Sequence, residues 1–209
     1  MIEDLFRRVL GVPPGTRKIN QDLAVMREII RPVQTQLIPF QEENELELLS
    51  LKYDCKSQKQ GFDKIFSGTI QSIYYEPMIA FCYKDYIKGV RDALIVCRTK
   101  NMEFIYRIKK NDVQIYFNGN HVAILDQHNV LYGLRSKSVL GRIKPYSNDL
   151  LSVIVKDKEV GHLFNPLRPH SYQQRAYTLI RHLNEEEEGI FLSFTLYEIV
   201  TRLMTNKKR

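Results

Sequence analysis

A long apolar stretch near the C-terminus, residues 189–204 (GIFLSFTLYEIVTRLM), constrains the fold of this chain more than any other feature. Asn184 and four glutamates precede the stretch and three basic residues follow it, which is the charge order of a capped helix. Its apolar residues surround the whole helix, as in a helix buried in protein or inserted in a membrane. The stretch is shorter than the roughly 20 residues that a bilayer requires, and it contains Glu198 and Arg202. The sequence therefore favours a core helix over residues 185–204, and a C-terminal membrane anchor is the alternative.

After Pro39 the chain alternates apolar and polar residues and is rich in β-branched and aromatic side chains, which is typical of strands. The clearest hairpin is VQIYF-NGN-HVAIL, because Asn118 and Gly119 tolerate the positive φ angles of a tight turn. Residues 45–51 (ELELLSL) fit a helix almost as well as a strand. The candidate strands are 45–54, 65–75, 78–87, 92–98, 103–109, 112–117, 121–126, 129–135, 138–144, 150–156, 159–164 and 174–183.

Small residues recur at matching places in three of these candidate strands. Ala123, Gly141 and Gly161 each stand second in a short apolar segment, at intervals of 18 and 20 residues. A small residue in a strand lets a bulky group approach that face closely. We expect the C-terminal helix or an aromatic side chain of a neighbouring strand to do so, and chance similarity among hairpins is the alternative.

The succession of hairpins with a Gly-x-hydrophobic segment, followed by an apolar C-terminal helix, resembles the tubby-like C-terminal superfamily. That superfamily includes the phospholipid scramblases and the LURP-one-related proteins. The segments LGRIKP, VGHLFNP and RAYTLIRHL carry the resemblance, which covers residues 138–204 by motif and about 45–209 by pattern. The chain lacks the cysteine-rich segment and the Pro-rich tail of scramblases, so the resemblance does not imply a stable membrane anchor.

The resemblance implies a mainly β protein with helices (α+β): a closed antiparallel barrel of about twelve strands around a buried C-terminal helix. Physical reasoning agrees, because closure removes edge strands, and a dozen strands leave a lumen too wide for their own side chains to fill. We expect one barrel domain over residues 41–209, with the central helix at 185–204.

Residues 1–40 are expected to form an N-terminal helical extension. A first amphipathic pattern ends at Gly11, and a second begins at Asn20 and ends at Pro32. Packing of such helices on another subunit would make a homo-oligomer, whereas packing on their own domain is the commonest outcome. The apolar residues at helical spacing are Ile2, Leu5, Phe6, Val9 and Leu10 in the first pattern, and Leu23, Met26, Ile29 and Ile30 in the second.

Cysteine usage and the N-terminus both indicate a cytoplasmic protein. Cys55, Cys82 and Cys97 show no CxxC spacing and lie among apolar residues, as reduced, buried thiols do. The first ten residues place acids before bases and contain no continuous apolar region, so they do not resemble a secretory signal.

The net charge of +7 is concentrated in residues 105–183, which contain 12 Lys/Arg against 5 Asp/Glu. A solvated surface would explain this excess, and so would attraction to anionic lipid or nucleic acid. We predict a basic barrel face that recognises anionic lipid head groups and makes the protein peripheral at a membrane. The candidate residues near predicted hairpin ends are Lys109, Lys110, Arg135, Lys137, Arg142, Lys144, Lys156 and Lys158, and Arg168 is added from the Pro-containing loop 164–172. A rigid connector is the preferred interpretation of that loop.

No common catalytic signature is present, so we expect a non-enzymatic protein without a cofactor or a metal. The chain contains no GxxxxGK[ST], GxGxxG, HExxH or GxSxG, and its five histidines are scattered singly.

Tyr106, Tyr116 and Tyr132 alternate with basic residues, as stacking surfaces for nucleic acid do. Tyrosine is also common in strands, so nucleic acid ranks behind the lipid hypothesis. The nucleic-acid hypothesis also ranks behind a second alternative, a structural protein that self-associates through its N-terminal helices.

Overall fold

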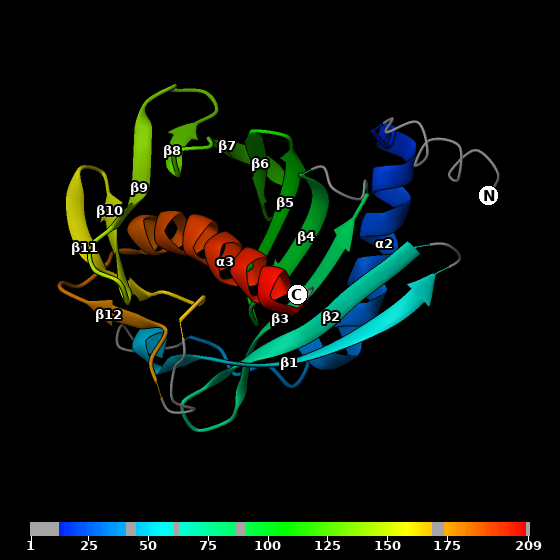
Figure 1. Cartoon of the computed structure of the whole chain (residues 1–209), viewed down its shortest axis with the longest axis horizontal. Helices are drawn as coiled ribbons and strands as arrows, with labels where there is room; N and C mark the ends of the chain where they lie inside the picture. Colours follow the sequence, from blue (N-terminus) through cyan, green and yellow to red (C-terminus); the bar gives the residue numbers. More distant parts are fainter. Residues whose placement is uncertain (1–12, 41–44, 61–62, 87–90, 169–173, 208–209) are drawn as a thin grey trace.

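The computed structural model describes residues 13–40, 45–60, 63–86, 91–168 and 174–207. Twelve strands form a single antiparallel sheet in which every strand pairs with its neighbours in sequence. The sheet curls around one helix, while a second helix lies outside it (Figure 1). The strands are β1 (Leu49–Gln60), β2 (Asp63–Ser72), β3 (Pro77–Asp85), β4 (Asp92–Arg98), β5 (Glu103–Lys109), β6 (Asp112–Phe117), β7 (Asn120–Leu125), β8 (Val130–Gly133), β9 (Val139–Pro145), β10 (Leu150–Val155), β11 (Lys158–Phe164) and β12 (Tyr177–Leu179).

The sheet nearly closes into a barrel where the chain segment before β12 meets the start of β1. Ser50 and Arg175 form an antiparallel bridge, and the Ala176 amide donates to the Leu49 carbonyl at 2.6 Å. Beyond this point the Glu47 carboxylate accepts the Leu179 amide at 2.7 Å and the Arg175 guanidinium at 3.3 Å. The Glu47 side chain thus replaces backbone hydrogen bonds that a longer pair of strands would form. The mainly β barrel predicted from the sequence is confirmed.

The strand boundaries differ from prediction at this seam, and at its other end β1 continues to Gln60, past the predicted end at residue 54. β12 has three residues instead of the predicted span 174–183, and β1 begins at Leu49 instead of residue 45. Residues Glu45–Leu48 form a 3-10 turn (η1), so the helical alternative for this segment holds for its first four residues. The turn presents the Glu47 carboxylate to the backbone of β12, and this contact ends the regular pairing.

The last helix, α3 (Glu185–Lys207), occupies the inside of the barrel (Figure 1). Every residue from 191 to 200 is buried, and Phe191, Phe194, Ile199 and Val200 are 0% exposed. This burial confirms the central helix predicted from the apolar stretch. Within the described residues, no helix is both long enough and apolar enough to span a membrane.

The polar side chains of α3 are satisfied inside the barrel. The Thr195 hydroxyl donates to the Phe191 carbonyl at 2.8 Å and lies 3.0 Å from the Tyr177 hydroxyl of β12. Glu198 and Arg202 form an ion pair one turn apart, and Arg202 also donates to the Asn165 side chain at 2.9 Å. These partners lower the cost of burying Thr195, Glu198 and Arg202 inside the barrel.

Gly141 and Gly161 permit two different close approaches. A Cβ on Gly141 would lie 3.0 Å from the Phe194 ring and 2.8 Å from the Ile154 carbonyl oxygen. Gly141 therefore makes room for the backbone of the neighbouring strand β10 and also for the central helix, which the sequence pattern predicted. A Cβ on Gly161 would instead lie 2.5 Å from the Thr178 carbonyl oxygen, so this glycine accommodates the backbone of the neighbouring strand β12.

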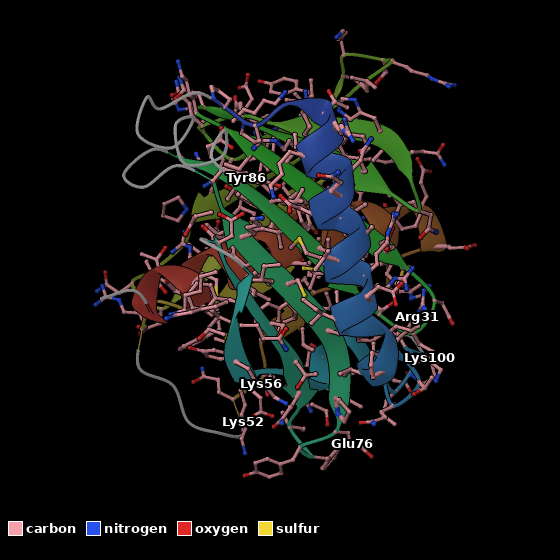
Figure 2. The ribbon with its side chains drawn as sticks, turned by 90° about the vertical axis from the view of Figure 1, so that its right-hand side faces the viewer. Arg31, Lys52, Lys56, Glu76, Tyr86 and Lys100 are labelled. Atoms are coloured by element: carbon pink, nitrogen blue, oxygen red, sulfur yellow. The ribbon has the colours of Figure 1, made fainter. Side chains whose placement is uncertain are left out.

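The first described helix, α2 (Thr16–Gln34), packs on the outer face of the sheet against β2, β3 and β4. Figure 2 shows α2 lying over the outer face of the sheet, with Tyr86 near one end of the helix and Arg31 and Lys100 near the other. It begins four residues before Asn20 and continues past Pro32, contrary to the predicted boundaries. Pro32 lies in the last turn, where its missing N–H removes one helical hydrogen bond and does not end the helix.

Apolar and ionic contacts together hold α2 on the barrel of its own chain. Met26 and Ile30 are buried, and so is Lys84 of β3, whose Nζ lies 2.8 Å from an Asp22 oxygen and 2.6 Å from an Asp63 oxygen. The Arg27 guanidinium makes a bidentate contact with Glu103 at 3.0 and 2.6 Å. The apolar side of α2 is thus used within this chain. The predicted first helix, in residues 1–10, lies outside the described residues.

Replacing Phe194 by alanine is expected to lower the free energy of unfolding by about 3 to 5 kcal/mol, because a fully buried aromatic leaves a cavity. This is a large part of the roughly 5 to 15 kcal/mol that stabilises a domain. Urea denaturation measures the change. Ile180→Ala is the matched control, since Ile180 is 57% exposed and should change stability by less than about 0.5 kcal/mol. Equal losses in both variants would contradict the central position of α3.

Ending the chain at residue 188 should leave an insoluble or molten product, because the barrel loses the side chains that fill it. A membrane anchor would behave in the opposite way, and its removal would leave a folded domain. Circular dichroism and a thermal scan distinguish the two results. A cooperative transition with a strand-rich spectrum would show that the barrel does not depend on α3.

Candidate functional site

Because all twelve strands run up and down in sequence order, successive turns lie at alternate ends of the barrel. We call the end that holds the N-terminus of α3 the acidic end, since Glu185, Glu186, Glu187 and Glu188 lie there. It also holds the β2–β3, β4–β5, β6–β7, β8–β9 and β10–β11 turns. The opposite end, which we call the basic end, holds the β3–β4, β5–β6, β7–β8, β9–β10 and β11–β12 connections and the last turns of α3.

The nine predicted cations divide between these two ends instead of forming one face. Five belong to the neighbouring hairpins of the acidic end, namely Arg135, Lys137, Arg142, Lys156 and Lys158, and four belong to the basic end, namely Lys109, Lys110, Lys144 and Arg168. Sequence spacing alone located these residues near hairpin ends. The direction of each strand, which decides the end, follows only from the complete pairing order.

Three of the nine cations already have partners. Arg142 forms an ion pair with Asp157 at 2.7 Å, and Lys156 forms one with Glu186 at 2.6 Å. The Arg168 Nε donates to the Asn148 carbonyl at 3.2 Å. Within the described part of the chain, the other six form no ion pair: Lys109, Lys110 and Lys144 at the basic end, and Arg135, Lys137 and Lys158 at the acidic end.

Some of these lysines occupy turn positions that favour other residues. Lys110, Lys137 and Lys156 have φ angles of 49°, 56° and 48°, in the left-handed region. That region costs an L-residue roughly 1 to 2 kcal/mol, and glycine or asparagine adopts it more readily. Backbone conformation therefore does not explain lysine at these positions. Lys156 has its ion pair with Glu186, whereas Lys110 and Lys137 have no such structural reason.

The turns of the basic end are tied to α3 and to one another. The Lys110 amide donates to the Arg91 carbonyl at 2.7 Å, and the Arg91 guanidinium donates to the Tyr197 hydroxyl of α3. Asn165, which accepts from Arg202, donates through its side-chain amide to the Asn148 carbonyl at 3.3 Å. These contacts agree with the prediction that the loop after β11 is a rigid connector. Its residues 169–173, which include His170, lie outside the described structure.

The acidic end contains an open cavity of about 820 Å³ between the first turns of α3 and the strands β6 to β9. Its wall is mostly apolar, and three glutamates stand along it. The lining residues are Asn101, Met102, Phe117, Asn118, Val122, Ala123, Leu131, Leu140, Glu185, Glu186, Glu188, Gly189, Ile190 and Ser193. The sequence prediction did not anticipate this cavity.

The N-terminus of α3 is closed by a capping box. The Asn184 side chain accepts the Glu187 amide at 2.9 Å, which confirms the predicted N-cap, and Glu187 accepts the Asn184 amide at 3.3 Å. Arg181 donates two hydrogen bonds to the same carboxylate at 2.9 and 2.7 Å. The hydrogen bonds from Arg181 are the main cause that lowers the pKa of Glu187 to about 2.

Two of the three thiols and one of the three proposed stacking tyrosines are buried, whereas Cys55, which was predicted to be buried, is half-buried. Burial raises the pKa of Cys82 to about 12 and also raises the pKa of Cys97, so neither thiol is an activated nucleophile. Tyr106, one of the three proposed stacking residues, is 0% exposed and packs on Tyr197. Among the residues that the structure describes, no three His, Cys, Asp or Glu side chains come together as a metal site.

No family model, curated protein or solved structure matches this chain. The resemblance to the tubby-like superfamily therefore stays a prediction, and the function is argued from the two ends of the barrel.

The capping contact at Glu187 predicts a specific loss of stability in acid. Because the folded pKa of about 2 lies below the ordinary value of 4.5, the ionised carboxylate stabilises the fold above pH 4.5. This contribution is lost as the pH falls from 4.5 through 2. Glu187→Gln should be less stable than the parent chain at neutral pH and should approach it near pH 2, as measured by urea denaturation.

The matched control for this prediction is Glu185→Gln, which changes the same charge at an exposed position of the same helical turn. It should stay close to the parent chain at both pH values. A constant difference between Glu187→Gln and the parent chain from pH 7 to pH 2 would contradict a role of the ionised carboxylate.

Proposed function

We propose that this chain is a non-enzymatic binding module that attaches to anionic phospholipid surfaces through its basic end. The observation that carries the proposal is that Lys109, Lys110 and Lys144 are exposed at that end and form no ion pair with the described residues. Arg91 and Arg168 are exposed on connections at the same end. The ammonium groups of Lys109, Lys110 and Lys144 can therefore contact an external anion.

Acids lie at both ends, since Asp112, Asp126 and Asp149 occupy turns of the basic end, but the densest run of acids is at the acidic end. At the acidic end, Glu185, Glu186 and Glu188 would repel an anionic surface, and Arg142 and Lys156 are already paired with carboxylates. Lys110 keeps a lysine where asparagine would stabilise the turn, as Lys137 does at the acidic end, so this conformation supports a role for both side chains and does not distinguish the ends. Costly backbone conformations are commonly retained where a side chain has a function.

The magnitude of the effect is sufficient for reversible recruitment to a membrane. Each Lys or Arg near an anionic membrane contributes about 1 kcal/mol, so three of them contribute about 3 kcal/mol at low salt. Salt screens such contacts over a Debye length of about 8 Å at physiological ionic strength. The proposed protein is therefore peripheral, on the cytoplasmic side where anionic lipids are concentrated, and its attachment depends on salt. The tubby-like resemblance makes phosphoinositides the first head groups to examine.

The proposal is tested by sedimentation of the full chain with phosphatidylcholine vesicles that contain phosphatidylserine or a phosphoinositide. We expect binding at low salt that weakens at higher salt, and no binding to phosphatidylcholine alone. The variant Lys109→Gln, Lys110→Asn, Lys144→Gln should lower the partition coefficient by on the order of a hundredfold. Lys110→Asn removes the charge while the turn keeps a residue that tolerates positive φ.

The matched control lowers the net charge equally at the opposite end, through Arg135→Gln, Lys137→Asn and Lys158→Gln. These three cations also lack an ion pair with the described residues, and Lys137 shares the left-handed conformation of Lys110. If both triple variants lose binding equally, attachment reflects net charge and not the basic end. Equal sedimentation with neutral and anionic vesicles would overturn the proposal as a whole.

A further inference from the structure

The cavity at the acidic end is hollow because three small residues face it. Gly189 is on α3 in the first turns, and an added Cβ there would meet nothing within 4 Å. Ala123 of β7 and Ser193 of α3 complete the set, and the Ser193 hydroxyl turns back to the Ile190 carbonyl at 2.7 Å. Larger side chains at these places would fill the space. Further along α3, every residue from 191 to 200 is buried.

The wall of the cavity presents apolar side chains that the fold does not fully bury. Met102, Phe117, Leu140 and Ile190 are only partly buried, although each packs against the main core, and Val122 is 36% exposed. Ligand pockets are lined mainly by apolar side chains such as these. The volume of about 820 Å³ lies within the roughly 300 to 1,000 Å³ that is usual for small-molecule sites.

All charged residues among the described lining of the cavity are acidic. Glu186 is partly neutralised by Lys156, and the fourth glutamate of the run, Glu187, is bound to Arg181 and does not line the cavity. Glu185 and Glu188 thus stand beside the apolar wall without an ion pair among the described residues. Burial, together with the nearby Glu185, raises the pKa of Glu188, so a positive charge placed between these carboxylates would be favoured.

We propose that this cavity binds a small amphipathic cation, whose apolar chain lies on Met102, Phe117, Leu140 and Ile190 and whose charged group lies between Glu185 and Glu188. The apolar wall supplies affinity, and the acidic rim selects the sign of the charge. This site is separate from the basic end, where the chain is proposed to attach to lipid, and it prefers the opposite charge.

The test uses isothermal titration calorimetry of the full chain with three amphiphiles of one chain length, each kept below its micellar concentration. The probes are decyltrimethylammonium, decyl sulfate and decyl maltoside. We expect the cation to bind about tenfold more tightly than the anion, with the neutral probe between them. Equal affinity for all three, or tighter binding of the sulfate, would overturn the proposal.

Gly189 offers a variant that fills the cavity and a matched control. Gly189→Leu places a side chain in the empty space and should weaken binding of the cation at least about tenfold, whereas Gly189→Ala should leave the affinity nearly unchanged. If the leucine variant does not fold, Glu185→Gln with Glu188→Gln tests the rim, because both residues lie at the cavity mouth. This double variant should lose the preference for the cation. Unchanged binding in the leucine variant would place the probe elsewhere and refute the site.

A result at one end of the barrel leaves the other proposal intact. Loss of vesicle binding in the Lys109, Lys110 and Lys144 variant, with unchanged binding of decyltrimethylammonium, would support two independent sites. If the same three substitutions also remove binding of the cation, the probe does not occupy the proposed cavity.

Discussion

The structure depends on a match between the width of the barrel and the apolar helix inside it. Twelve strands enclose more space than their own side chains can fill, and α3 supplies the missing volume with Phe191, Phe194, Ile199 and Val200. The helix in turn needs the barrel, because a helix that is apolar on all sides has no stable position in water. Gly141 shows how close the match is, since the strand gives up a side chain to admit the Phe194 ring.

The same arrangement gives the barrel two chemically different ends. A helix inside a barrel has one terminus at each opening, and here the N-terminal opening carries the glutamates that favour the start of a helix. The simple up-and-down pairing order then assigns every other turn to the same end. Topology and helix chemistry together place the run of glutamates at one opening, and they bring residues far apart in sequence, such as Lys109 and Lys144, to the other.

Features that depend on neighbouring residues were predictable from the sequence. Asn184 caps α3, and the Asn118-Gly119 turn has the positive φ values that its residues favour. Features that depend on distant partners were not. Glu47 replaces part of a strand pair because β12 happens to pass it, and the acidic-end cavity exists because Gly189 and Ala123 face the same empty space. No local sequence pattern predicts either the contact of Glu47 with β12 or the cavity.

The position of α3 in the chain has a consequence for biosynthesis. The helix follows all twelve strands in sequence, yet it touches the β3–β4 connection, where Arg91 contacts Tyr197 across a separation of 106 residues. A ribosome releases the strands first, so the inner, apolar face of the sheet has nothing to cover it until synthesis reaches α3. Such exposed strands are prone to aggregate, and contacts this distant in sequence form slowly. Folding of this domain can therefore be completed only after its last helix has emerged.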